Sequence, residues 1–256
     1  MKRLLAFAVL AVAFASGVYA VCRADGEKVK TENRSVGKFT KIAIDCSLCV
    51  HYTQGKNVSV KVEGPEDKLQ NVMTKMEGGT LVVSCTKAQK RSGSGSFFFN
   101  TGDMSGVEVY VTSPDLVGVR LLGSGDFDCR SKLDTDNMKI ELRGSGDIYF
   151  SDIICDNIYT ELVGSGDVVL KNVDALKSVV SLVGSGDITI YQKNVKTTTA
   201  TLKGSGDITM WFTKCGTADC SLMGSGDFEL KGTLGRLNKK TLGSGDYDTS
   251  GLRTGN

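Results

Sequence analysis

The sequence contains few of the residues that interrupt β-structure or that support common catalytic chemistry. Only two prolines occur in 256 residues, so extended segments can pair without interruption. His51 is the only histidine, and no nucleophile elbow or other catalytic signature surrounds it. Catalysis by a Ser/His/Asp or Cys/His arrangement would have to use this one imidazole. The sequence therefore predicts a protein that is not an enzyme, in which His51 is a surface residue or a hydrogen-bonded residue of a strand.

An excess of charge of either sign is also absent. The chain has 31 Lys and Arg against 29 Asp and Glu, and two of the cations, Lys2 and Arg3, lie in an N-terminal segment that we expect to be removed. Without these two the counts are 29 and 29, and the net charge is zero. A neutral chain offers no electrostatic attraction for nucleic acid or for an acidic membrane surface, so we expect neither as a partner.

Long apolar runs are missing except near the N-terminus, where Leu4 to Ala15 form a run too short to span a bilayer. The preceding cations and the A-x-A-like Val18-Tyr19-Ala20 predict a signal peptide over residues 1–20. The mature chain then has no transmembrane span, and the protein is exported to the periplasm, the outer-membrane surface or the exterior. Lipidation of Cys22 is the alternative, although Tyr19-Ala20-Val21 matches a lipoprotein signal poorly.

Cysteine, in contrast, is frequent. All eight cysteines follow Ala20, and an even number in an exported chain favours disulfides or buried thiols over cytosolic redox chemistry. The sequence does not determine their pairing. Cys46-Ser47-Leu48-Cys49 forms a CxxC motif, but it lies in an expected strand without a helix start, and no second CxxC follows. We therefore expect no redox or metal role for it.

The tetrapeptide Gly-Ser-Gly-Asp (GSGD) occurs seven times and decides the architecture. It starts at Gly123, Gly144, Gly164, Gly184, Gly204, Gly224 and Gly243, in steps of 21, 20, 20, 20, 20 and 19 residues. The segments between the motifs are rich in Val, Ile, Thr and Leu. A regular period of this kind predicts an all-β, right-handed parallel β-helix in which each repeat forms one coil of about 20 residues.

Alignment of the repeats gives the positions that face the core. Apolar residues recur at even offsets from each motif, as in a strand whose alternate side chains share one face. One such column contains Leu121, Leu142, Leu162, Leu182, Leu202 and Leu222. The glycines share this parity and are predicted to face inward, which leaves Ser and Asp facing outward. Coils about 4.8 Å apart would make a rod of roughly 34 Å.

The residues before the first motif lack the tetrapeptide but also resemble strands. We expect residues 21–118 to form an N-terminal cap with irregular first coils, and residues 119–256 to form the regular coils, continuous with 33–118 in one domain. Expected strands are Phe39 to Asp45, Cys49 to Thr53, Val58 to Val62, Thr80 to Cys85 and Val107 to Val111, with a short helical turn near Glu66 to Val72.

A succession of short segments resembles a known family. The segments are Lys38 to Ile42, Cys49 to Gly55, Val58 to Gly64 and Gly79 to Val83, followed by Pro114-Asp115-Leu116 and the GSGD coils. This pattern is similar to the auto-transporter adhesin family with a head GIN domain, common in Bacteroidetes. The resemblance implies an exported β-helix with an adhesin-like role, and it implies no catalytic residues.

The repeated aspartates form a candidate site. They are Asp126, Asp147, Asp167, Asp187, Asp207, Asp227 and Asp246. Carboxylates about 4.8 Å apart repel by roughly 0.9 kcal/mol per pair even in water, so something should compensate for the repulsion. Hydrogen bonds from the N–H groups of the turns are the simpler explanation. The alternative is Ca²⁺ held between coils, the one cofactor that the sequence suggests.

Outward-facing aromatic residues are candidates for a binding surface. Tyr191 and Trp211 share a column in adjacent coils, with Tyr149 two coils earlier. They could form a platform for a surface glycan or protein, or they could simply stabilise the sheet by packing across coils. The sequence as a whole predicts an adhesin-like binding or scaffold protein of the cell envelope. The alternatives are a polysaccharide-active β-helix enzyme and a calcium-stabilised structural solenoid.

Overall fold

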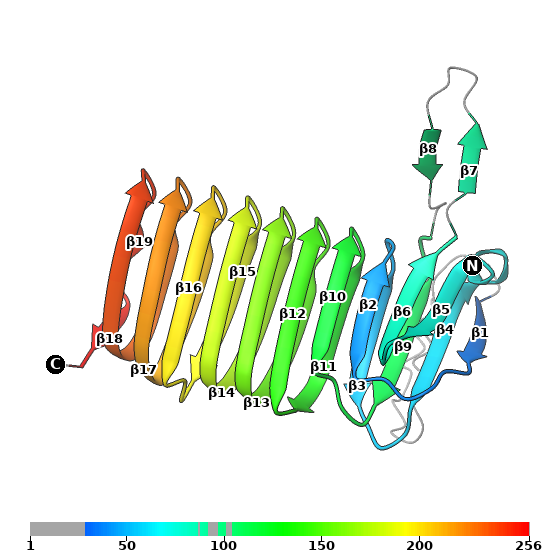
Figure 1. Cartoon of the computed structure of the whole chain (residues 1–256), viewed down its shortest axis with the longest axis horizontal. Helices are drawn as coiled ribbons and strands as arrows, with labels where there is room; N and C mark the ends of the chain where they lie inside the picture. The colour runs from blue at the N-terminus through cyan, green and yellow to red at the C-terminus, as the bar shows by residue number, and fades with distance from the viewer. Residues whose placement is uncertain (1–28, 87, 92–96, 101–103, 256) are drawn as a thin grey trace, which may run out of the picture.

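The protein folds as a parallel β-helix, as the sequence predicts. The computed structural model describes residues 29–86, 88–91, 97–100 and 104–255, so the predicted signal peptide and Cys22 lie outside the described residues. Figure 1 shows the coils stacked in a row, with the C-terminus at one end and the less regular N-terminal strands at the other. No helix in the described part of the chain is long and apolar enough to cross a membrane.

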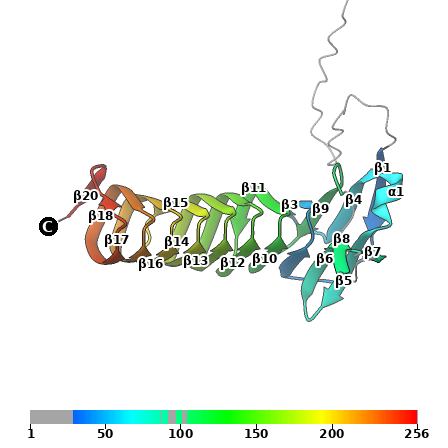
Figure 2. The ribbon, with the colours of Figure 1, turned by 90° about the horizontal axis from the view of Figure 1, so that it is seen from above.

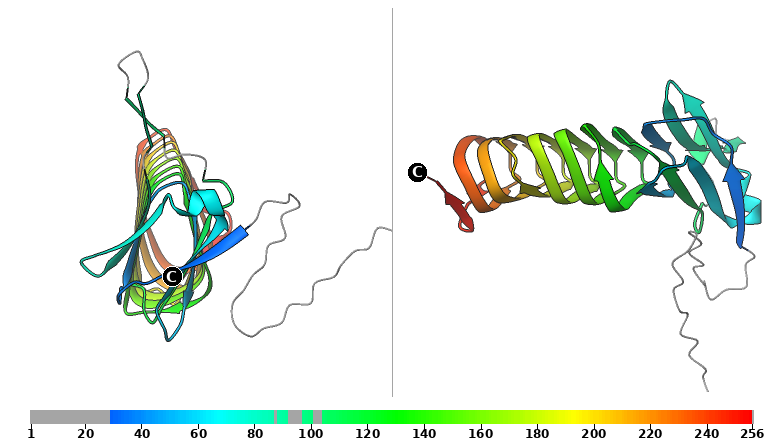
Figure 3. Two further views of the ribbon diagram at one scale, coloured as in Figure 1. Left: turned by 90° about the vertical axis from the view of Figure 1, so that its right-hand side faces the viewer. Right: turned by 90° about the horizontal axis from the view of Figure 1, so that it is seen from below.

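Each regular coil contains two sheet segments joined by a GSGD turn. The strands are β10 (Gly118–Gly123), β11 (Asp126–Asp134), β12 (Asn137–Gly144), β13 (Ile148–Gly164), β14 (Asp167–Gly184), β15 (Asp187–Lys193), β16 (Thr197–Gly204), β17 (Ile208–Gly224), β18 (Phe228–Gly243), β19 (Tyr247–Asp248) and β20 (Leu252–Thr254). Segments before the turns pair in parallel with one another, as do segments after the turns. We call these two sheets the upstream face and the downstream face; they enclose the flattened coil visible end-on in Figure 3.

The N-terminal strands are stacked in an order that differs from their order in the chain. They are β1 (Val29–Arg34), β2 (Lys41–Asp45), β3 (Cys49–Gln54), β4 (Ser59–Pro65), β5 (Val72–Glu77), β6 (Thr80–Cys85), β7 (Ala88–Arg91), β8 (Phe97–Asn100) and β9 (Glu108–Ser113), with the short helix α1 (Glu66–Leu69). β2 pairs with β6 on one side and β10 on the other, and β3 lies likewise between β9 and β11. The β2–β3 coil is therefore inserted between the later β6–β9 coil and the first GSGD coil.

The N-terminal end of the stack is covered by antiparallel strands. β4 pairs antiparallel with β9, β1 with β4, and β5 with β6, while β7 and β8 form a separate two-stranded hairpin. Figure 2 shows β1, β4 and α1 gathered at this end of the rod. A change from parallel to antiparallel pairing interrupts the repeat at this end, which limits further parallel addition of coils.

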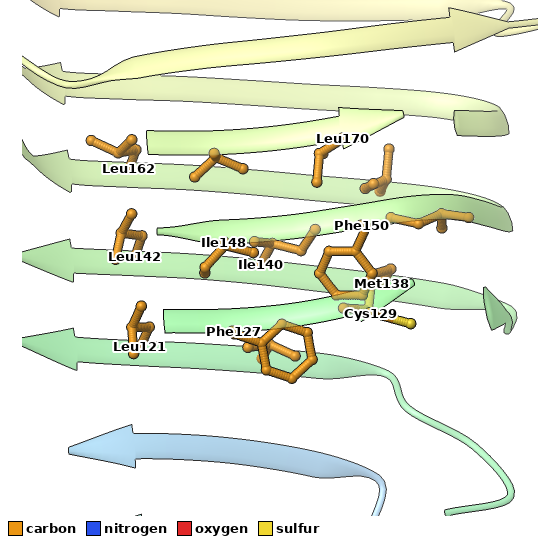
Figure 4. Packing of buried hydrophobic residues seen from close by; sticks show 14 of the residues in the cluster. Leu121, Phe127, Cys129, Met138, Ile140, Leu142, Ile148, Phe150, Leu162 and Leu170 are labelled. Carbon is orange, nitrogen blue, oxygen red and sulfur yellow. The ribbon is translucent and has the colours of Figure 1, made fainter. Parts of the chain in front are cut away.

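The predicted core columns are confirmed. The leucine column from Leu121 to Leu222 is fully buried, and Figure 4 shows Leu121, Leu142 and Leu162 one above another. Gln192 is a polar exception inside the coil. Its side-chain amide donates to Ser178 Oγ at 2.8 Å and its carbonyl accepts from Thr198 Oγ1 at 2.7 Å, so this buried amide is hydrogen-bonded.

The predicted inward direction of the motif glycines is wrong, although the need for glycine is real. A Cβ on Gly184 would lie 2.1 Å from the carbonyl oxygen of Gly164 in the preceding coil, so it points along the stack and not into the core. The φ of Gly184 is +137°, a conformation that side chains disfavour. That same Gly164 oxygen accepts from the N–H groups of Ser185 and Gly186 at 2.9 and 3.1 Å. Close backbone approach between coils therefore requires glycine here.

Candidate functional site

The motif aspartates form a continuous hydrogen-bond ladder between coils. The backbone N–H of each donates to Oδ1 of the aspartate one coil earlier, at 2.8 to 3.2 Å, for Asp147, Asp167, Asp187, Asp207, Asp227 and Asp246. These bonds are the compensation that the expected carboxylate repulsion requires, because an N–H dipole faces one oxygen of each accepting aspartate. Burial in the row raises the pKa of Asp167 above its ordinary value.

Tyr191 and Trp211 form the centre of an outward column on the downstream face. Their rings stack with centroids 5.6 Å apart and planes inclined by 9°. Lys171 Nζ lies 4.0 Å from the Tyr191 centroid, and Lys231 Nζ lies 5.1 Å from that of Trp211. We call these four residues the Lys–Tyr–Trp–Lys column. Because each ring face meets a ring or an ammonium group, a partner would contact the ring edges and the lysines.

Tyr149 does not belong to this column, which corrects the predicted surface of three aromatics. Tyr149 pairs with Val169, and Val169 pairs with Thr189, so its column lies two residues away from Tyr191. The guanidinium of Arg130 lies 5.6 Å from the centroid of the Tyr149 ring instead. The structure thus brings together two of the three predicted aromatic residues.

A cluster that the sequence did not predict lies on the same face, at the junction between the β2–β3 coil and the first GSGD coil. β3 and β11 pair in parallel, with His51 opposite Asp128 and Cys49 opposite Asp126. One ligand atom each from Cys49, His51 and Asp128 lies within 4.8 Å of the other two. All three side chains are partly exposed. The expectation that His51 is merely a surface or hydrogen-bonded strand residue misses this grouping.

The charges in this cluster reinforce one another. His51 Nδ1 donates to Asp128 Oδ1, and this hydrogen bond, followed by one with Cys49, raises the pKa of His51 to about 10. Burial raises the pKa of Asp128, but His51 and Arg130 more than offset it, so that the pKa lies below its ordinary value. Without a bound cation an imidazolium–carboxylate pair is therefore the stable state of these two groups near neutral pH, and a cation that binds this ring nitrogen has to displace its proton.

Among the described residues seven cysteines are free thiols. Cys46 is buried, with Sγ 3.8 Å from the carbonyl oxygen of Val83, whereas Cys49 is partly exposed. The two cysteines of the CxxC motif therefore have different surroundings. Sequence spacing could not reveal the cluster that includes Cys49, because Asp128 is 77 residues beyond His51 and is placed beside it only by the register of β3 and β11.

Comparisons with known proteins agree with this architecture. A family model described as "Putative auto-transporter adhesin, head GIN domain" matches residues 38–215 and, in an overlapping second match, residues 180–256. A crystal structure described as a "putative adhesin" from Bacteroides fragilis is similar, with 25% identity and a TM-score of 0.73 over 87% of this chain and 97% of that one. A search of curated proteins found no match.

Two further solved structures share the fold at lower identity. A "Putative lipid binding protein" from Parabacteroides distasonis has 20% identity and a TM-score of 0.70, over 87% of this chain and 96% of its own. A "putative adhesin" from Parabacteroides merdae has 17% identity and a TM-score of 0.59, over the same shares of the two chains. At these identities the likeness concerns the fold alone.

Proposed function

We propose, from the finding that the chain belongs to the auto-transporter adhesin family with a head GIN domain, that it is an exported, non-catalytic surface protein. In this proposal the downstream face of its β-helix binds a surface glycan or another protein. The predicted signal peptide over residues 1–20 supports export, and a mature N-terminus at Val21 in the purified native protein would test it.

The Lys–Tyr–Trp–Lys column carries the proposal for the binding face. Trp211 is 39% exposed on a flat sheet whose backbone is fixed by pairing on both sides. Aromatic side chains with polar neighbours contribute strongly to recognition, since they lose little conformational entropy on binding. The two lysines add cationic groups that suit a hydroxylated, acidic partner.

A polysaccharide-active enzyme has less support. Glycoside hydrolysis requires two carboxyl groups flanking a sugar-binding cleft. A hollow of about 780 Å³ near the C-terminus is lined by Gly235, Arg236, Leu237, Thr249, Leu252, Thr254 and Gly255, and these residues include no carboxylate. The motif aspartates, which are numerous, are instead engaged in the ladder between coils.

A binding screen of the mature chain against glycan arrays and matrix proteins tests the proposal. Wild type would be compared with Trp211→Thr and with Thr199→Ala, a control on the upstream face, each with matched circular dichroism. We expect binding that Trp211→Thr weakens at least tenfold and Thr199→Ala leaves unchanged. Equal binding by all three proteins would refute the assignment of the binding surface to the downstream face. Absence of binding to every glycan and matrix protein tested would refute the adhesin-like role.

Melting temperatures measured with calcium and with chelator distinguish the proposed binding protein from the alternative of a calcium-stabilised scaffold. A specifically bound ion raises the melting temperature in proportion to the logarithm of its concentration above Kd. The ladder hydrogen bonds lead us to expect a melting temperature that changes little between millimolar calcium and chelator. A large calcium-dependent rise, abolished by Asp187→Asn, would favour the scaffold.

A further inference from the structure

We propose that Cys49, His51 and Asp128 form a Zn²⁺ site on the downstream face, independent of the surface-binding role. Cys49 and His51 are two residues apart on β3, so both side chains point to the same side of the sheet. The neighbouring strand β11 places Asp128 opposite His51. The Cys49 sulfur, one ring nitrogen of His51 and one carboxylate oxygen of Asp128 lie within 4.8 Å of one another.

The donor set selects the metal. Zn²⁺ takes thiolate, imidazole and carboxylate ligands at about 2.0–2.3 Å in tetrahedral geometry, so that neighbouring ligand atoms are about 3.3–3.6 Å apart. The three ligand atoms lie within 4.8 Å of one another, so side-chain rotations that move each atom by about 1 Å bring them to these separations. Ca²⁺ and Mg²⁺ prefer oxygen ligands throughout. A water can complete the coordination, because all three side chains reach solvent.

The surrounding residues hold two of the ligands in place. Arg130 Nε donates to the other oxygen of Asp128, Oδ2, at 2.9 Å. The His51 ring stacks on Tyr110, with centroids 4.9 Å apart, and Glu108 Oε2 lies 3.8 Å from His51 Nε2. The Tyr110 hydroxyl in turn donates to Glu108 Oε2 at 2.5 Å. Histidine ligands of metals commonly direct their second ring nitrogen toward a carboxylate in this way.

His51 Nε2, the ring nitrogen that is not bonded to Asp128, faces Glu108. It is shielded from solvent and has no hydrogen-bond partner in the described part of the chain. Buried polar atoms are nearly always hydrogen-bonded, so an unsatisfied ring nitrogen needs an explanation. Metal binding at the other nitrogen would leave Nε2 as a donor toward Glu108, which a small rotation of the ring brings into hydrogen-bond distance.

A metal fits this cluster better than a catalytic triad does. In a triad the nucleophile and the acid contact opposite nitrogens of the histidine. Here a single ring nitrogen of His51 lies near both the Cys49 sulfur and the Asp128 carboxylate. The backbone N–H groups of β3 also lie in a sheet paired on both sides, which leaves none directed outward to stabilise an oxyanion.

The position of the site indicates its role. It joins β3 to β11 where the β2–β3 coil is inserted out of chain order. A metal linking residues 77 apart in sequence closes a long loop of the unfolded chain, so its binding favours the folded junction. We infer that the ion fastens the N-terminal cap to the regular stack.

Cobalt substitution and calorimetry test the site in the full mature chain. After treatment with a chelator, we expect one equivalent of Zn²⁺ to bind with a micromolar or lower Kd and to raise the melting temperature. Co²⁺ should give a sulfur-to-cobalt charge-transfer band. Cys49→Ser and Asp128→Asn should each weaken Zn²⁺ binding at least tenfold, and Cys49→Ser should abolish the charge-transfer band.

Two variants serve as matched controls. Cys155→Ala removes another thiol, and Asp156→Asn removes another carboxylate; they lie six and seven residues along β13 from Tyr149, the residue paired with Asp128, so neither should change metal affinity. The wild-type cobalt spectrum requires no variant to fold. A chain that binds no Zn²⁺ at millimolar concentration, or a charge-transfer band that persists in Cys49→Ser and disappears in Cys155→Ala, would overturn the proposal.

Discussion

Alanine substitutions at three motif glycines separate the two reasons why the GSGD turn needs glycine. Gly184 has a φ of +137° and a virtual Cβ 2.1 Å from the Gly164 oxygen. Gly186 meets the Gly166 oxygen at 2.0 Å, but its φ lies outside the left-handed region. Gly123 has a φ of +112° and no atom within 4 Å of its virtual Cβ. An alanine would therefore meet both backbone strain and a steric clash at Gly184, a clash alone at Gly186, and strain alone at Gly123.

The expected costs follow from this geometry. A residue held in a glycine-only conformation costs about 1–3 kcal/mol. Relief of a 2.1 Å contact requires the two coils to separate by about 1 Å, which weakens the two N–H bonds to Gly164 O by about 1 kcal/mol each. We expect Gly123→Ala to cost about 1–2 kcal/mol, Gly186→Ala about 2–3 and Gly184→Ala about 3–5.

Urea unfolding followed by far-ultraviolet circular dichroism measures these differences. Solenoids unfold in parts when one repeat is weakened, so the m-value has to be compared with that of wild type before the midpoints are converted to free energies. Hydrogen exchange at the coil on either side of the substitution localises the effect. A Gly123→Ala variant as unstable as Gly186→Ala would refute the assignment of the clash to the carbonyl of the preceding coil.

Three further substitutions test the aspartate ladder, the Lys–Tyr–Trp–Lys column and the ion pairs of Glu141 with Lys139 and Arg120. Asp187→Ala removes the acceptor of the Asp207 N–H and should cost about 1–2 kcal/mol, seen as faster hydrogen exchange of that amide; unchanged exchange would contradict the ladder. Trp211→Ala should lower the melting temperature by about 2–4 °C, since a stacked pair contributes about 1 kcal/mol; an unchanged value would contradict cross-coil packing. Burial raises the pKa of Glu141, but Lys139 and Arg120 hold it below its ordinary value. The ion pairs therefore stabilise the fold above the unfolded-state pKa near 4, and this stabilisation is lost as the pH falls through the lower pKa of the folded state. Glu141→Gln should lower the free energy of unfolding by about 1 kcal/mol at pH 7 and by almost nothing at pH 2, and an equal loss at both pH values would exclude the ion pairs.

The regular coils could be predicted because each carries its own marker. The motif sets the register, and once Leu142 and Leu162 are aligned on it, the neighbouring core positions follow from alternation until the next bend, where the register shifts, as between Leu170 and Val173. The direction of the glycines could not be derived in this way. Parity says which face a strand residue occupies, but the positive φ at Gly184 rotates the position of its Cβ toward the neighbouring coil.

The N-terminal stacking order needed information that the sequence does not display. Nothing in Lys41–Asp45 marks β2 as the neighbour of both β6 and β10, since no repeat aligns the three strands. The misplacement of Tyr149 has a simpler cause. Its outward direction follows from alternation, but its column depends on counting whole coils, which lead from Tyr149 to Thr189 and not to Tyr191.

Within each coil, the residues that hold neighbouring coils together are different from the outward strand residues that a partner could contact. The bonds of the GSGD turns run along the stack, from Ser185 and Gly186 to the preceding glycine and from Asp187 to the preceding aspartate. These bonds hold adjacent coils in register and use only residues of the motif, so they do not involve the outward positions farther along the strands. Outward positions are then free to vary from coil to coil, and a uniform turn cannot by itself distinguish one partner from another. In the proposed binding role, recognition depends on features that break the repeat, and the outward column around Trp211 is one of them. The Cys49–His51–Asp128 cluster also breaks the repeat on the downstream face, but the role proposed for it is a separate one.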